Sequence, residues 1–252
     1  MTTLFTQDIW LLISLAVIAL TAGFVHSAIG FGFGIVAVSL VPLVIDVRQA
    51  HVVISISSVP VIVAAAWSYR KGVRFDDLKP ALVGAAIFLP IGLALFEWLP
   101  MDALVRATGV AILAMVVIRL RNRRMPEHDE PDGGGSCFVA GAAGGFLAGA
   151  VSIAGPPIAA FALKQNWTPA RFKAFVNQFL LLVSIYKVAG LGMRGFLDGP
   201  TLVQALWLAP AAIGGIFLGV RVSGRISSLW FERLVAAALV AISLMFIIRG
   251  AS

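Results

Sequence analysis

Two short stretches rich in glycine and proline interrupt long apolar runs, and polar side chains stand beside both. The first stretch reads SAIGFGFG over residues 27–34, and the second reads SIAGPP over residues 152–157. A break in an apolar helix exposes a new helix N-terminus, whose partial positive charge and free N–H groups suit an anion. We therefore expect an anion-binding backbone here, with close helix packing as the alternative. The residues concerned are Gly30, Gly32, Gly34, Gly155, Pro156 and Pro157.

Three polar residues next to the breaks are candidates for contact with the bound group. His26 lies deep in an apolar segment, where an ionisable group is costly, so it could bind substrate or titrate in proton coupling. Its alternative role is a neutral imidazole satisfied by a backbone carbonyl. Ser27 and Ser152 flank the breaks, where their hydroxyls could contact the anion or cap a half-helix.

Further polar residues lie along a later apolar segment. Asn177 and Gln178 are near its middle, and Ser184 follows Asn177 on the same helical face. These side chains could line a substrate path, or they could hydrogen-bond between helices. Lys187, next to Tyr186, is interpreted as a side chain that extends to the membrane interface.

Two arginines begin corresponding apolar segments in the two halves of the chain. Arg48 and Arg171 could attract anions at the two mouths of a pathway, or they could anchor their helices at the interface.

Enzymatic chemistry finds little support in the sequence. An intramembrane serine hydrolase built on Ser27 or Ser152 with His26 or His51 is the least favoured alternative, because no Gly-x-Ser-x-Gly or His-Glu-x-x-His motif occurs. The chain also lacks the ATP-binding Gly-x-x-x-x-Gly-Lys-Ser/Thr motif, and Cys137 is its single cysteine. We expect no catalytic residue, no metal and no cofactor.

The composition requires lipid as the solvent for most of the chain. Of the 252 residues, 60% are hydrophobic and 12% are charged, and the mean hydropathy is +0.98. Soluble domains have about 45–50% apolar and about 25% charged residues. The net charge of +7 comes from Lys and Arg placed mostly between apolar runs, which orients a membrane protein and does not indicate nucleic-acid binding.

Ten apolar segments follow one another along the chain, five on each side of a polar stretch. Residues 121–136 are rich in Arg, acidic residues, Pro and Gly, as in a solvated linker. We predict a first membrane repeat over 1–120, a cytoplasmic linker over 121–136 and a second membrane repeat over 137–252. The expected segments are about 9–27, 34–45, 50–69, 79–96 and 102–119, then 138–151, 156–164, 170–191, 201–220 and 231–248.

The two halves also match in sequence and in the distribution of charge. Gly23-Phe24 aligns with Gly145-Phe146, and the two breaks align, which indicates a tandem duplication. With the linker in the cytoplasm and each short pair entering and leaving on one side, 14 of the 19 Lys and Arg lie inside. With each pair as one broken crossing the count falls to 11, so the positive-inside rule favours inverted repeats. Inverted repeats with broken helices are typical of secondary transporters.

These motifs resemble the TauE/SafE family of sulfite and organosulfur-anion exporters, also called the sulfonate uptake permease family. The resemblance covers nearly the whole chain. It implies transport of small anions, often sulfur-containing, across the cytoplasmic membrane. It is carried by Gly23-Phe24, residues 27–34, Pro42, Arg48-Gln49-Ala50, residues 70–73, residues 144–146, Gly149, residues 155–157 and Arg171-Phe172.

The sequence thus predicts an all-α polytopic protein of two inverted repeats, with 8–10 membrane segments and short, broken first pairs. We expect a multi-pass secondary transporter in the inner membrane that moves small anions, of sulfite or organosulfonate type, by alternating access. A passive channel and a membrane assembly factor are the alternatives. Lipid and the anion are the expected partners, nucleic acid is not, and proton coupling and homo-oligomerisation stay open.

Overall fold

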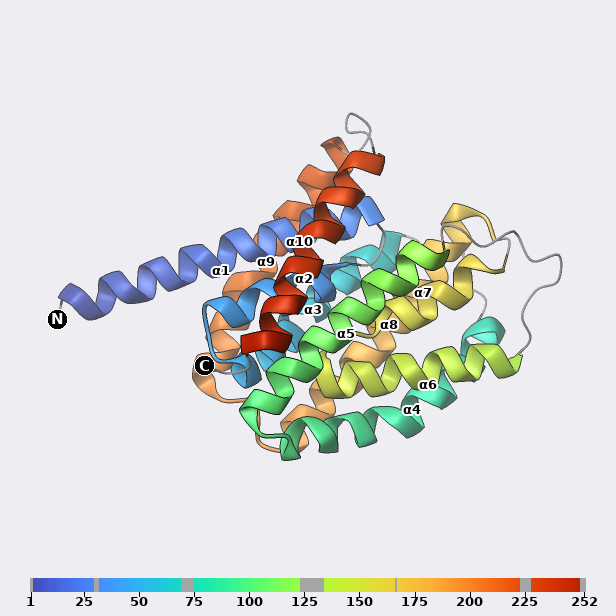
Figure 1. Ribbon diagram of the computed structural model, residues 1–252, viewed down its shortest axis with the longest axis horizontal. Helices are drawn as coiled ribbons and strands as arrows, with labels where there is room; N and C mark the ends of the chain where they lie inside the picture. Colours follow the sequence, from blue (N-terminus) through green and yellow to red (C-terminus); the bar gives the residue numbers. More distant parts are fainter. Residues whose placement is uncertain are drawn as a thin grey trace.

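The chain folds almost entirely into α-helices in the computed structural model, which describes residues 2–29, 32–68, 75–122, 134–165, 167–222 and 228–249 (Figure 1). Each predicted apolar segment corresponds to one helix, except that 34–45 is shared by α2 and the short η1. The elements are α1 (Thr2–Ile29), α2 (Phe33–Leu40), η1 (Val41–Leu43), α3 (Val47–Ser68), α4 (Phe75–Trp98), α5 (Met101–Asn122), α6 (Gly134–Val151), α7 (Gly155–Leu163), α8 (Pro169–Met193), α9 (Gly199–Val222) and α10 (Ser228–Arg249).

Within the described ranges, six helices are long and apolar enough to cross a bilayer. A helix rises about 1.5 Å per residue, so about 20 residues cover a hydrocarbon core about 30 Å thick. Large apolar side chains such as Val17, Ile87 and Leu206 are exposed on the outside of the bundle, as expected of a lipid-facing surface. The prediction of an all-α polytopic membrane protein is confirmed. The six spans are Ile9–Ser27, Val47–Trp67, Phe75–Trp98, Gly134–Val151, Ala170–Met193 and Gly199–Gly219.

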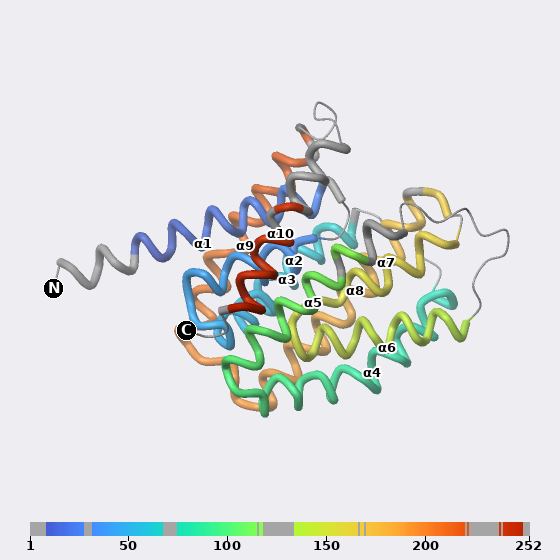
Figure 2. The backbone as a smooth tube through the Cα atoms, viewed as in Figure 1, coloured from blue at the N-terminus to red at the C-terminus, as the bar shows by residue number. Residues whose placement is uncertain are grey.

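Small residues allow the closest helix pairs to form. Helix α4 packs along α6, and α1 packs along α9 (Figures 1 and 2). A Cβ atom added to Gly145 of α6 would lie 2.5 Å from the Cα atom of Ala85 on α4. One added to Gly23 of α1 would overlap the backbone carbonyl of Ala212 on α9. Van der Waals packing drives helix association in lipid, so glycine here lets the backbones approach.

Helices of each half pack mainly on helices of the other half. In the first half, α1 packs on α9 of the second half, while α6 of the second half packs on α4 of the first. Helix α3 packs on α8, and α5 packs on α10. The two halves therefore form one interlocked bundle. The division at a linker over 121–136 stays a prediction, because residues 123–133 lie outside the described residues.

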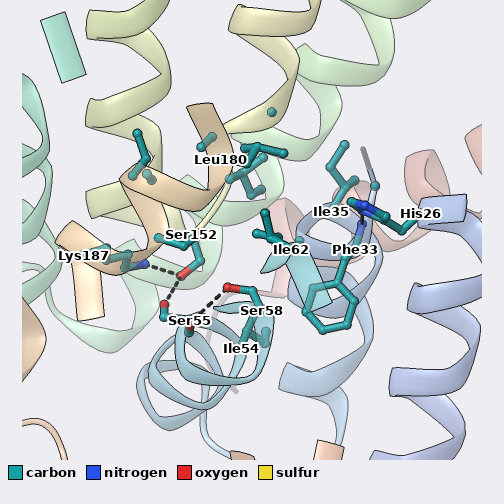
Figure 3. Close-up of a pocket in the computed structure, with 18 of the residues that line it drawn as sticks. His26, Phe33, Ile35, Ile54, Ser55, Ser58, Ile62, Ser152, Leu180 and Lys187 are labelled. Carbon is teal, nitrogen blue, oxygen red and sulfur yellow. Dashed lines mark hydrogen bonds between the residues drawn. The ribbon is translucent and has the colours of Figure 1, made fainter. Parts of the chain in front are cut away.

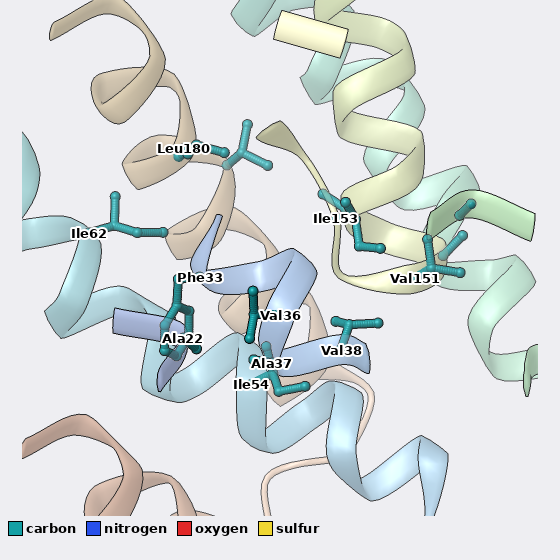
Figure 4. Packing of buried hydrophobic residues seen from close by; sticks show 14 of the residues in the cluster. Ala22, Phe33, Val36, Ala37, Val38, Ile54, Ile62, Val151, Ile153 and Leu180 are labelled. Atoms are coloured by element: carbon teal, nitrogen blue, oxygen red, sulfur yellow. The ribbon is translucent and has the colours of Figure 1, made fainter. Parts of the chain in front are cut away.

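Both predicted breaks are present in the bundle. Helix α1 ends at Ile29 and α2 begins at Phe33, while α6 ends at Val151 and α7 begins at Gly155. Gly30 lies outside the described residues. The short α2 is enclosed by other helices, because Phe33, Val36 and Ala37 are buried among apolar side chains (Figure 4).

Candidate functional site

The two breaks meet at one cavity of about 60 Å³. The first break contributes Gly32, Phe33 and Gly34, and the second contributes residues 152–156. The breaks are in direct contact, since a Cβ atom added to Gly34 would lie 3.2 Å from the carbonyl oxygen of Ser152. Helices α3 and α8 supply most of the remaining wall (Figure 3).

Ser152 reverses the chain at the end of α6. Its φ of 58° lies in the left-handed region, the one such value for a non-glycine residue in the described ranges. That conformation costs an L-residue about 1–2 kcal/mol. The N–H groups of Ser152 and Ile153 donate back to the carbonyls of Ala148 and Leu147, at 3.1 and 3.2 Å. Strained backbone of this kind concentrates at functional sites, and here it places the Ser152 hydroxyl at the cavity.

Lys187 of α8 brings a buried amino group to the same point. The residue is only 4% exposed, and its Nζ atom donates to the Ser152 hydroxyl at 2.5 Å. Across the described parts of the chain, no Asp or Glu oxygen lies within 4.0 Å of this Nζ atom. A buried ammonium without a counter-charge is strongly disfavoured, so a charged Lys187 would need a negative group from a bound molecule.

A chain of hydrogen bonds behind Ser152 fixes the direction of its hydroxyl. Thr108 donates to the Leu104 carbonyl at 2.8 Å, so its oxygen accepts from Nε2 of His51 at 3.1 Å. Nδ1 of His51 is then unprotonated and accepts from Ser152 at 3.0 Å.

Ser55 completes this arrangement from the next turn of α3. Its hydroxyl donates to the His51 carbonyl at 2.6 Å, and the Ser152 hydroxyl lies 3.3 Å from the same carbonyl oxygen. The Ser152 hydroxyl can donate to His51 at either Nδ1 or the carbonyl, and in both cases a lone pair of its oxygen faces Lys187.

His26 forms the other polar end of the cavity. It is 3% exposed, and its Nδ1 atom accepts from the Phe33 N–H, the first of α2, over a long 3.5 Å. Asn177 interacts with the imidazole and also donates to the Lys173 carbonyl at 2.8 Å. No group within the described ranges meets hydrogen-bond geometry with Nε2 of His26. This N–H can therefore be shared between Asn177 and a bound group.

Apolar walls separate the two polar ends. Figure 3 shows Lys187 with Ser152 on one side of the cavity and His26 with Phe33 on the other, with Ile62 between them. Ile54, Leu180 and Val183 also line the space. The site therefore offers a few directed donors in a largely apolar enclosure, which is the usual composition of a small-molecule site.

Several residues singled out from the sequence lie elsewhere. Ser27 donates to the Phe24 carbonyl at 2.8 Å, and its hydroxyl faces Gly219 on α9. Gln178 donates to the Ala66 carbonyl at 3.1 Å and so links α8 to α3. Neither side chain lines the cavity, and Asn177 and Pro157 do not line it either.

Both arginines proposed for the mouths are engaged by protein groups. Arg48 donates to the carbonyls of Glu97 and Leu99, at 2.9 and 2.7 Å, and lies over the ring of Phe96. Arg171 pairs with Asp77 at 2.6 Å and lies 4.5 Å from the ring centre of Trp167. A role in attracting anions stays a prediction for both.

The residue that the sequence interpretation undervalued is Lys187. The structure buries it at the cavity, whereas we expected it to extend to the membrane interface. A signal was present in the spacing, because Asn177, Ser184 and Lys187 fall at i, i+7 and i+10 on one helical face.

The six long apolar helices in the described ranges define a multi-pass membrane protein, and a small, largely apolar cavity with a few polar groups lies between its two breaks. The sequence profile of the family described as "Sulfite exporter TauE/SafE" matches residues 15–246. The chain belongs to this family of membrane transporters, and the resemblance noted in its motifs is confirmed. Comparisons with curated proteins and with solved structures give no significant match.

Proposed function

We propose that the chain is a secondary transporter that moves small anions across the inner membrane by alternating access. The observation that carries this proposal is the buried amino group of Lys187, which has no acidic partner in the described ranges and lies at the cavity between the breaks. An anion in the cavity would supply the counter-charge that an ammonium at this position needs.

Donors for the anion converge from both breaks. Beside Lys187, the first turn of α2 presents backbone N–H groups that lack partners within their own helix. Nε2 of His26 adds a donor at the far end. In a low-dielectric site, such donors bind an anion more strongly than they would in water.

The size of the cavity favours a compact anion. A single water needs about 10–15 Å³ of such space, so about 60 Å³ accommodates only a few non-hydrogen atoms. Sulfite, with one sulfur and three oxygens, and the head group of a small sulfonate are of this size. Both agree with the description of the family as sulfite exporters.

The packing of helices from one half on helices of the other half supports alternating access. Each half contributes one break to the cavity. The long helix before each break, α1 or α6, packs on a helix of the other half, α9 or α4. Inverted repeats, which the sequence predicts for the two halves, permit one group of helices to rock against the other around a fixed site.

Flux through proteoliposomes tests the proposal. Purified protein is reconstituted, and uptake of labelled sulfite, methanesulfonate, taurine and acetate is compared with uptake by protein-free liposomes. We expect saturable uptake of at least one of these anions, accelerated by unlabelled anion on the opposite side. Movement of a cation or a neutral solute without any anion would refute the anion proposal, and anion flux without this acceleration would indicate a channel.

A further inference from the structure

We propose that Lys187 takes up a proton when the anion binds and releases it when the anion leaves, so that one proton accompanies each anion. This inference rests on the proposed function and identifies the group that carries the proton. Lys187 lines the cavity together with Ser152 and Ser55.

Among the described residues, no negative charge faces Lys187 from the helices that pack on α8. Helix α8 packs on α3, α4, α6 and α7, and of these only α4 contains acidic residues. Those acids lie near the two ends of α4, where Asp76 pairs with Lys79, Asp77 with Arg171 and Glu97 with Arg194. The titratable group nearest in the hydrogen-bond chain is His51, which is reached through Ser152. In the empty cavity, an ammonium at Lys187 would thus have no compensating charge.

Both protonation states of Lys187 fit the contact with Ser152. The Ser152 hydrogen points at His51, so its oxygen only accepts from Lys187. A neutral amine retains N–H groups for that contact and leaves its lone pair toward the cavity. When an anion enters, a proton from water adds to this lone pair, and the new N–H bond can point at the anion. Departure of the anion reverses the step and returns the proton to water.

His26 is poorly placed to carry the same proton. Its Nδ1 atom accepts from the Phe33 N–H at the start of α2. A proton on Nδ1 would point at the Phe33 N–H and repel it, beside the positive end of the α2 dipole. His26 therefore suits a fixed donor through Nε2.

Calorimetry on the purified full-length protein tests the inference. Methanesulfonate is titrated in two buffers of different ionisation enthalpy, because this strong-acid anion brings no proton of its own. The difference in heat gives the protons taken up per anion bound. We expect uptake above zero that approaches one as pH rises, with Kd weakening by up to about tenfold per pH unit. Binding without proton uptake at every pH would overturn the inference and leave anion binding intact.

Three variants identify the group that carries the proton. Lys187→Arg keeps a permanent charge, so we expect binding without proton uptake. His51→Gln can still hydrogen-bond Ser152 and Thr108, and in it, as in His26→Ala, each bound anion should still bring its proton. Uptake that persists in Lys187→Arg, or that disappears in His51→Gln or His26→Ala, would refute Lys187 as the carrier. If the wild-type protein neither bound nor moved any anion, the proposed function itself would fail.

Discussion

At the first break the cavity meets a helix N-terminus and an imidazole, whereas at the second it meets a lysine and an oriented hydroxyl. The two breaks occupy matching places in the two halves and touch each other through Gly34 and Ser152. Their local sequences nevertheless provide different donors.

Proline explains much of this difference. Helix α7 begins with Gly155, followed by Pro156 and Pro157, which have no N–H groups. Helix α2 begins with Phe33 and Gly34, which keep theirs. The second break can offer fewer backbone donors to an anion, and the side chains of Ser152 and Lys187 take their place. The repeated framework sets where the site lies, while the residues at each break set its chemistry.

Lys187→Met should have the largest effect. It removes the amino group that distinguishes the second break from the first. We expect anion affinity to fall by about 100-fold or more, because losing a buried charge that faces an anion costs about 2–5 kcal/mol. Calorimetric Kd values for methanesulfonate measure this. Lys79→Met, which removes an exposed lysine paired with Asp76, is the matched control and should bind normally. Equal affinities in both variants would show that Lys187 does not face the anion.

Ser152→Ala and Ser152→Gly distinguish the effect of the hydroxyl from the effect of backbone strain at the second break. Both variants lose the contact that orients Lys187, and we expect about tenfold weaker binding from a hydrogen bond to a charged group, worth about 1.5 kcal/mol. Glycine also relieves the positive φ, so Ser152→Gly should unfold at a higher temperature than Ser152→Ala. Thermal unfolding in detergent measures the second effect. A glycine variant no more stable than the alanine one would argue against strain at this position.

His26→Ala should have a smaller effect at the first break. It removes one neutral donor, worth about 0.5–1.5 kcal/mol, so we expect affinity to fall about fivefold. His26→Gln, which can still donate, should recover part of the loss. Affinity lost as fully as in Lys187→Met would mean that the two ends of the cavity are equivalent.

Ser27→Ala should have the smallest effect. Its hydroxyl is satisfied by the Phe24 carbonyl and faces α9, away from the cavity. We expect Kd and transport rate within about twofold of the wild type, since the lost bond is local and neutral. A larger loss of binding, with thermal stability unchanged, would place Ser27 on the substrate path.

Most of the fold could be predicted from the sequence because lipid imposes strict rules. Apolar runs of about 20 residues, interrupted by glycine and proline, located the helices and both breaks. The meeting of the breaks depends on close packing of α1 with α9 and α4 with α6, which involves residues far apart in the chain.

The polar network of the site was harder to predict for the same reason. The role of Lys187 depends on the hydroxyl of Ser152, which lies in the second break, and on the absence of nearby acids among the described residues. The contacts of Thr108 and His51 likewise join α5, α3 and the second break. Spacing along α8 could group Asn177, Ser184 and Lys187 on one face, but it could not show that Ser184 and Lys187 line the cavity at the breaks.

The position of a bound anion tests the proposed site most directly. Selenite resembles sulfite, and its selenium atom can be located by anomalous scattering in crystals of the protein. We predict one selenium peak in the cavity between the breaks, with selenite oxygens within hydrogen-bond distance of Nζ of Lys187 and directed toward the start of α2. A peak only at Arg48, at Arg171 or on the outer surface, with the cavity unoccupied, would contradict a substrate site between the two breaks.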